Sequence, residues 1–253
     1  MNLFRLTAAT IFTRKTFAIF FVLFIVLPMF LPFLTPWEEK PALFEPARAQ
    51  AAWGFLWMTS IGWLLFQGAS FGDRWASDGV LEYLKTLGAS RFSQLFQVWL
   101  SCMMFFAGFV ALVLGVCFVA AMPSDGYEAK MWIATNLQYA TMVMLVIAPL
   151  VLLSIALGTR INATAAYVIT VCVALYGLFG VSYLDFFLSQ AGNPLLDFIY
   201  LISPHYYLAE ITSRLVFKLG ALEASAFGNI CLYLSGLGLV ISSFACLIFT
   251  EKK

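Results

Sequence analysis

The sequence has the composition of an integral membrane protein. Of its 253 residues, 62% are hydrophobic and only 11% are charged, whereas charged residues make up about 25% of ordinary soluble domains. The formal net charge is +1 and no basic run occurs, which excludes a phosphate-binding face for nucleic acid. We therefore expect an all-α protein that lies in a lipid membrane.

Cysteine and histidine usage gives no sign of metal or redox chemistry. All five cysteines lie inside apolar runs, no Cys-x-x-Cys pair occurs, and the single histidine is His205. A zinc site needs about four ligands in suitable spacing. A histidine without such partners is more often structural than catalytic. No metal site is predicted.

Apolar runs predict six transmembrane helices, because each is long enough to cross the hydrocarbon layer. A basic and partly apolar segment, residues 1–15, precedes the first of them and predicts an amphipathic helix at the membrane interface. An even number of spans places both termini on one side of the membrane. The predicted spans are residues 16–34, 51–70, 95–121, 134–157, 165–184 and 227–250.

The connection between the second and third spans, residues 71–91, contains a short amphipathic segment. Asp78 is a suitable N-cap and Gly88 a suitable left-handed residue just past a helix end. Leu81 and Leu84 fall on one face, and Glu82 and Lys85 on the other. Periodicity alone fits two interpretations equally well: a solvated loop helix packed under its own protein, or a short helix that lies on the membrane surface.

The connection between the fifth and sixth spans, residues 185–226, is too polar for a further crossing and too apolar for a free loop. Ser203 and Pro204 predict the start of a helix of about four turns that stops at Gly220. Within it, Glu210 and Arg214 have the spacing of a stabilising pair. After Asn193-Pro194, the apolar piece 195–201 can dip back into the bilayer.

The basic residues predict the orientation. Placing the termini, residues 71–91 and the loop with Arg160 on one side collects about nine of the 14 basic residues there, and the basic side is normally cytoplasmic. We therefore expect a multi-pass protein of the cell membrane, of the bacterial inner-membrane kind. Both termini would be cytoplasmic and residues 185–226 would face outward.

Several chemistries are missing from the sequence. No Gly-x-x-x-x-Gly-Lys-Ser/Thr motif and no Gly-Lys pair occurs, so the chain is not expected to hydrolyse ATP. The predicted spans carry no Asp, Glu, Lys or Arg near their middle, which argues against an ion-coupled carrier. They also lack a buried histidine or carboxylate that would activate a serine, so an enzyme is not expected.

A few uncharged polar side chains do lie within the predicted spans. They can hydrogen-bond between helices, which is the commoner role of buried amides, or they can line a passage for a substrate. The residues considered for such a passage are Gln67, Gln97, Asn136 and Gln138.

The order of these parts resembles the membrane subunit of ATP-binding-cassette exporters of the type-2 permease family. The link between the second and third spans carries the resemblance, reading Asp78-Gly79-Val80, Leu81-Glu82-Tyr83-Leu84 and Gly88-Ala89-Ser90-Arg91. It departs from the family pattern in Asp78 for glutamate, Val80 for threonine and Gly88 for proline. The resemblance covers nearly the whole chain.

The resemblance implies a function in a larger assembly. Two permease subunits would pair, as a homodimer or a heterodimer, and each would receive an ABC ATPase subunit that binds ATP and Mg; the chain itself would hold no cofactor. The coupling helix that contacts the ATPase would comprise Asp78, Gly79, Leu81, Glu82, Leu84, Lys85 and Arg91. Outward re-entrant helices would precede the sixth span, with an external gate at Ser203, Pro204, His205 and Tyr206.

Three functional hypotheses remain at this point. The first is the permease subunit of an ATP-driven exporter. The second is a membrane scaffold or assembly subunit that holds a cytosolic partner with the same helix, transports nothing and has a sealed core. The third, an ion-coupled carrier, is the least favoured because the predicted spans lack buried charge.

Overall fold

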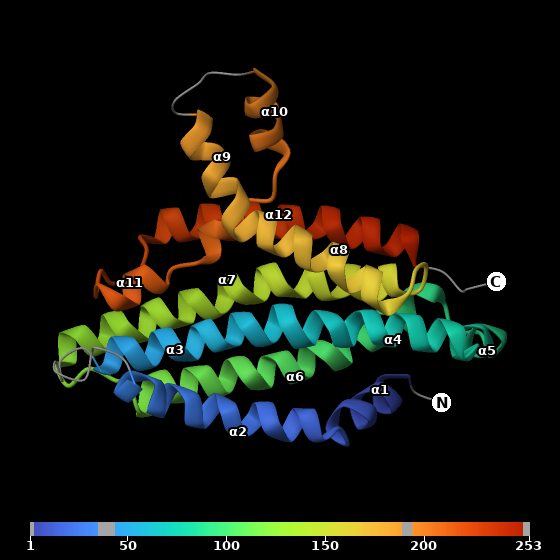
Figure 1. The fold of residues 1–253 in the computed structure, drawn as a ribbon, viewed down its shortest axis with the longest axis horizontal. Coiled ribbons are helices and arrows are strands. Elements are labelled where there is room, and N and C mark those ends of the chain that lie inside the picture. Colours follow the sequence, from blue (N-terminus) through green and yellow to red (C-terminus); the bar gives the residue numbers. More distant parts are fainter. Residues whose placement is uncertain (1–2, 35–43, 189–193, 250–253) are drawn as a thin grey trace.

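The computed structural model describes residues 3–34, 44–188 and 194–249, and this part of the chain contains helices and turns but no strand. The prediction of an all-α fold is confirmed. Figure 1 shows a long bundle from whose flank one helical hairpin projects. The elements in chain order are α1 (Leu3–Phe12), α2 (Lys15–Phe30), η1 (Leu31–Leu34), α3 (Phe44–Thr59), η4 (Ser60–Leu64), α4 (Leu65–Ser77), α5 (Val80–Thr86), α6 (Arg91–Val119), α7 (Gly126–Gly158), α8 (Ala163–Leu175), η5 (Tyr176–Gly180), α9 (Val181–Leu188), α10 (Pro194–Ile202), η6 (Tyr206–Ala209), α11 (Thr212–Val216) and α12 (Ala224–Ile248).

The part of the chain that the structure describes contains fewer helices able to cross a membrane than the six predicted. By length and composition, four helical runs there are long and apolar enough: α6, α7, Ala163–Leu188 and α12. The pair α1 and α2, bent by 64°, makes a fifth if it is counted as one span. The predicted second span, 51–70, lies inside the continuous helical run α3–η4–α4. This run is less apolar because tryptophans, glycines and Gln67 interrupt its aliphatic residues.

Helix α1 packs along α6 through one narrow face. Its buried residues Leu3, Thr7 and Ile11 recur every four positions, the spacing that places side chains on one side of a helix. The Ser101 hydroxyl of α6 donates to the Phe4 carbonyl at 3.0 Å. These contacts hold α1 against the bundle, although the chain bends sharply between α1 and α2.

Helix α7 is the central helix and contacts α4, α6, α8 and α12. Its contact with α4 is very close at Gly72 and Gly158. A Cβ atom on Gly72 would meet the Ile155 carbonyl group, and a Cβ on Gly158 would meet the Ala69 carbonyl group. Such small residues let membrane helices approach backbone to backbone. The Ser154 hydroxyl adds a hydrogen bond to the Leu65 carbonyl at 2.6 Å.

The prediction that Asp78 caps the amphipathic helix is wrong. Asp78 ends the preceding helix α4, and its amide donates to the Arg74 carbonyl at 2.8 Å. Gly79 follows with φ 69° and stands before the first helical residue, Val80, without any capping side chain. Because Gly79 turns the chain in the left-handed region, α5 begins later than Asp78 would place it.

The prediction for the other end of α5 is confirmed. Gly88 has φ 88°. Its amide donates to the Lys85 carbonyl at 2.9 Å, and the Ala89 amide donates to the Leu84 carbonyl at 3.0 Å. This pair of bonds is the Schellman motif that commonly ends helices at glycine. Helix α5 therefore has a firmly closed C-terminus.

The four-turn helix predicted after Ser203 does not form. The chain makes the short 3-10 helix η6 and then α11, with Glu210 between them in an extended conformation (φ −88°, ψ 96°). The Glu210 carboxylate accepts from the Thr212 amide at 3.2 Å and from the Tyr139 hydroxyl at 3.0 Å. These contacts replace the predicted pair of Glu210 with Arg214, whose Nε donates to the Gly220 carbonyl at 2.9 Å.

The hairpin that projects from the bundle is formed by α9 and α10 (Figure 1). Helix α9 continues α8 through the π-helical segment η5. Helix α10 contains the apolar piece 195–201 and begins at Pro194, whereas Asn193 lies outside the described residues. Many of the hairpin's large side chains are exposed, among them Tyr183, Phe186, Phe187, Leu195, Phe198 and Leu201.

Candidate functional site

A groove of about 780 Å³ lies between α3 with η4, the α8–η5 region and α11. Its wall is open at Gly54 and Gly62, because a Cβ atom at either position would meet nothing within 4 Å. Apolar side chains form most of the lining. They are Trp57, Met58, Ile61, Leu175, Leu178, Phe179, Val216 and Phe217, whereas the polar lining residues are Gln50, Glu210, Thr212 and Ser213.

Both π-helical segments of the described chain contribute to this groove. Segment η4 supplies Ile61 and Gly62, and η5 supplies Leu178 and Phe179. A π-helical turn inserts an extra residue into a helix, locally widens it, and occurs frequently at functional sites. Because two such turns line the same groove, we take the groove as the leading candidate site.

A polar network closes one side of the groove around Tyr139 of α7. The indole Nε1 of Trp57 donates to the Tyr139 hydroxyl at 3.0 Å. That hydroxyl donates in turn to the Glu210 carboxylate at 3.0 Å and lies 2.8 Å from the Thr212 hydroxyl. Because the Tyr139 proton goes to Glu210, the Thr212 hydroxyl must be the donor in their contact.

The ring of Tyr139 is held as firmly as its hydroxyl. The indole of Trp53 stacks on it with ring centroids 4.3 Å apart. The Trp53 Nε1 donates to the Asn136 side-chain oxygen at 2.8 Å, and the Asn136 amide donates to the Trp132 carbonyl at 2.9 Å. The network therefore joins α3, α7 and the segment around Glu210, which are distant in sequence.

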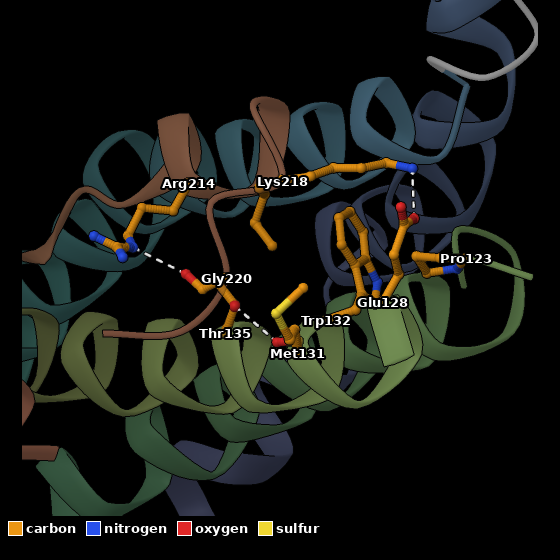
Figure 2. Close-up of a pocket in the computed structure, with 9 residues that line it drawn as sticks. Pro123, Glu128, Met131, Trp132, Thr135, Arg214, Lys218 and Gly220 are labelled. Atoms are coloured by element: carbon orange, nitrogen blue, oxygen red, sulfur yellow. Dashed lines mark hydrogen bonds and ion pairs between the residues drawn. The ribbon is translucent and has the colours of Figure 1, made fainter. Parts of the chain in front are cut away.

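The nearby cations are bound elsewhere. Figure 2 shows Lys218 against Glu128, where Nζ and the carboxylate are 2.8 Å apart, and Arg214 against the Gly220 carbonyl. Lys218 also lies 4.0 Å from Glu45. Within the described residues no cation stands at ion-pair distance from Glu210, which keeps an exposed carboxylate beside an apolar groove.

Glu210 is a site residue that is not predicted from the sequence. The predicted spans carry no charge near their middle, yet the fold brings Glu210 from a connection onto Tyr139, which belongs to the predicted span 134–157. The available signal was an acidic residue inside the mostly apolar stretch 206–217. The i to i+4 spacing to Arg214 drew attention to a local pair instead.

The residues predicted for partner coupling lie together on and around α5. Leu81 and Leu84 are 1% and 5% exposed and hold the helix to the bundle, whereas Glu82 and Lys85 are exposed. The Gln94 side-chain amide donates to the Leu81 carbonyl at 3.2 Å. Figure 1 shows α5 at the end of the bundle where α1 begins and α12 ends; we call this the α5 end. Gly79 forms the turn into the helix, and Asp78 and Arg91 are exposed beside it.

The predicted gate residues join three elements near the base of the hairpin. The Ser203 hydroxyl lies 2.7 Å from the Tyr176 hydroxyl of η5, and the His205 amide donates to the Tyr233 hydroxyl of α12 at 3.1 Å. Tyr206 is fully buried, and burial, with a smaller contribution from Tyr233, raises the pKa of its phenol. A Cβ atom on Gly177 would lie 2.7 Å from the Pro204 carbonyl oxygen, so the segment is in backbone contact with η5.

The polar residues considered for a passage form hydrogen bonds within the protein. Gln67 accepts from Arg14 at 2.8 Å, and Gln97 accepts from the Phe4 amide at 3.3 Å. Gln138 binds both backbone groups of Leu222, at 2.7 and 2.9 Å. Asn136 belongs to the Trp53 contact described above. These bonds have the pattern of amides that join helices, and the groove is lined by other residues.

Comparison of the chain with protein-family models, curated proteins and solved structures finds no match. Among the described residues, no group of three or more His, Cys, Asp or Glu side chains is arranged to hold a metal ion. The groove with its polar network and the exposed face of α5 are therefore the two features on which a function can be argued.

Proposed function

We propose that the chain is the membrane subunit of an ATP-driven ABC exporter, with the groove as part of its translocation path. The observation that carries the proposal is α5: a short helix held between Gly79 and the Gly88 motif, with its apolar face buried and Glu82 and Lys85 exposed. A helix fixed at both ends can transmit a rigid displacement from a partner to the spans on either side.

The proposed membrane arrangement completes this picture. The α5 end is cytoplasmic with both termini, α3–η4–α4 is a sixth crossing, α1 lies at the interface, and the α9–α10 hairpin re-enters from outside. A second permease subunit pairs with the chain in the cell membrane, and an ATPase that binds ATP and Mg docks on α5. Aromatic side chains in α3 suit a crossing whose ends lie at the membrane interface.

The groove favours an exporter over a scaffold. A scaffold subunit needs a sealed bundle, whereas the π-helical segments and the open wall at Gly54 and Gly62 maintain a hollow of about 780 Å³. An apolar hollow with a few convergent polar groups is the usual form of a small-molecule site. Stimulation of ATPase activity by substrates in proteoliposomes separates the two functions, because a scaffold gives none.

The coupling role is tested with the double variant Glu82→Ala and Lys85→Ala. We expect normal insertion but clearly weaker co-purification of the ATPase, because exposed charges at the centre of a docking face set partner binding. The matched control is Lys130→Ala with Glu223→Ala, a pair of exposed charges away from α5. The proposal would be contradicted if both double variants recovered the same amount of ATPase. It would also be contradicted if no ATPase co-purified with the native protein.

A further inference from the structure

The groove combines a long apolar lining with one carboxylate at its edge. Glu210 is exposed toward the groove, and only one of its oxygens, Oε1, receives the bonds from Tyr139 and Thr212. Through its bond to Tyr139, Glu210 lies at the outer end of the predicted span 134–157 and borders the apolar lining of the groove. A few polar groups beside an apolar lining commonly fix the orientation of a ligand, and a carboxylate in this place favours a ligand with a positively charged head.

Among the described residues, no basic side chain supplies this charge at ion-pair distance. The nearest basic side chains along the chain, Arg214 and Lys218, bind the Gly220 carbonyl and the Glu128 carboxylate. The groups that do contact Glu210, a phenol and a backbone amide, are neutral donors. They hold the carboxylate in place and bring no positive charge to it. The negative charge thus remains available to a molecule in the groove.

We propose that the groove binds an amphiphile with a cationic amine head, with the head at Glu210 and the apolar chain along Trp57 and Phe179. This inference rests on the proposal that the groove is a transport path, and it adds the chemical class of the substrate. The volume of about 780 Å³ accommodates a chain-bearing molecule of ordinary size. Charge complementarity fixes the direction in which the molecule lies.

Binding can be measured without any ATPase. The purified protein is placed in phosphatidylcholine nanodiscs and titrated with dodecylammonium carrying bromine near its chain end, which quenches the fluorescence of nearby tryptophans such as Trp57. The same brominated chain with an alcohol head and with a sulfate head gives the matched comparisons. We expect the ammonium to bind about tenfold more tightly than the alcohol, the free-energy scale of one charge-assisted hydrogen bond, and the sulfate to bind most weakly.

Two variants test separately how the charged head and the apolar chain of the ligand contribute to binding. Glu210→Gln keeps an acceptor for Tyr139 and Thr212 but loses the charge, so the ammonium should fall to the affinity of the alcohol. Gly54→Leu projects a side chain into the open groove and should weaken ammonium and alcohol alike. Gly115→Leu, at an equally open helical position outside the groove, should change neither.

The source of the amine is distinguished by the lipid. Part of the phosphatidylcholine is replaced with phosphatidylethanolamine. Weaker dodecylammonium binding then indicates that a lipid amine occupies the same place, whereas unchanged binding indicates a non-lipid amphiphile. Both results support an amine site. Equal affinity for all three heads, preference for sulfate, or no effect of Glu210→Gln overturns the proposal. The binding assay contains no ATPase, so a negative binding result would not contradict the exporter function. Failure to co-purify an ATPase would likewise not contradict a positive binding result.

Discussion

Tyr139 shows how much one side chain can hold together in this bundle. Its hydroxyl bonds to the Trp57 indole, the Glu210 carboxylate and the Thr212 hydroxyl, while its ring stacks on Trp53. The partners come from α3, from the segment between η6 and α11, and from the first residue of α11. The Tyr139 phenol and the Thr212 amide therefore hold Glu210 beside the groove.

Replacing this phenol gives a prediction at the same scale. Tyr139→Phe leaves the ring stacked but removes the acceptor for Trp57 Nε1 and the donor for Glu210. We expect a loss of about 1–3 kcal/mol of unfolding free energy, because buried polar groups lose their partners. Thermal unfolding in a mild detergent measures it. Tyr127→Phe, at a side chain 73% exposed, is the control; an equal effect of both variants would contradict the prediction.

At the scale of elements, the contact between α4 and α7 sets the position of the α5 end. Gly72 and Gly158 bring the two backbones together, and the Asp73 carboxylate accepts from the Ala163 amide at 3.0 Å, which ties the start of α8 to α4. Helix α5 follows directly after α4. Movement of α5 is therefore transmitted into α7, the central helix.

A single methyl group tests this contact. Gly72→Ala places a Cβ atom against the Ile155 carbonyl group, and neither backbone can yield without separating the helices. Overpacking of this kind costs about 1–3 kcal/mol, which should appear as a lower melting temperature of the purified protein. Gly115→Ala, whose Cβ meets nothing within 4 Å, should not lower it. An unchanged melting temperature for Gly72→Ala would show that the helices are not in backbone contact.

At the scale of the whole molecule, the described chain has two distinct ends. The start of α1, helix α5, the turn at Arg160 and the end of α12 share one end, and the Arg160 Nε donates to the Ile248 carbonyl at 2.6 Å. Helix α7 begins at the other end of the bundle (Figure 1). Membrane orientation follows if basic residues keep the first end in the cytoplasm.

Labelling of introduced cysteines measures this orientation. We expect Lys130→Cys to react with a membrane-impermeant maleimide added to intact cells, and Glu82→Cys to react only after permeabilisation. The native cysteines lie in α6, α8 and α12, which are candidate spans, so the parent protein should give little background from outside. Reaction of both positions from the same side would show that the bundle does not cross the membrane as proposed.

Much of the fold could be predicted because it depends on local patterns. Long apolar runs predicted α6 and α12 within a few residues, since a run of that length satisfies its backbone only as a helix in lipid. They predicted the end of α7 equally well, but α7 begins at Gly126, ahead of the predicted start at residue 134. Gly88 predicted the end of α5 because few residues other than glycine adopt a positive φ without strain. The prediction that Asp78 is the N-cap of α5 was wrong. The residue types Asp-Gly fit both an N-cap at Asp78 and the observed turn at Gly79, so the sequence does not distinguish the two.

The candidate groove could not be predicted in this way. Ser203-Pro204 and the Glu210–Arg214 spacing are typical of a continuous helix. The Glu210 carboxylate instead accepts from Tyr139, which is distant in sequence, and Arg214 donates to the nearby Gly220 carbonyl. The π-helical segments η4 and η5 have no recognisable sequence pattern either. Tertiary contacts outweighed local propensity here, because propensity is worth only about 1 kcal/mol per residue.

Residue order alone is enough to predict that this protein is helical, lies in a membrane, and carries a short amphipathic helix that ends at Gly88. Hydrophobic run length and backbone restrictions at glycine act locally, so both can be read from residue order. The contact between Glu210 and Tyr139 beside an apolar groove, in contrast, forms only in the folded chain. That meeting depends on how α3, α7 and α11 pack, and packing joins residues that no local pattern connects.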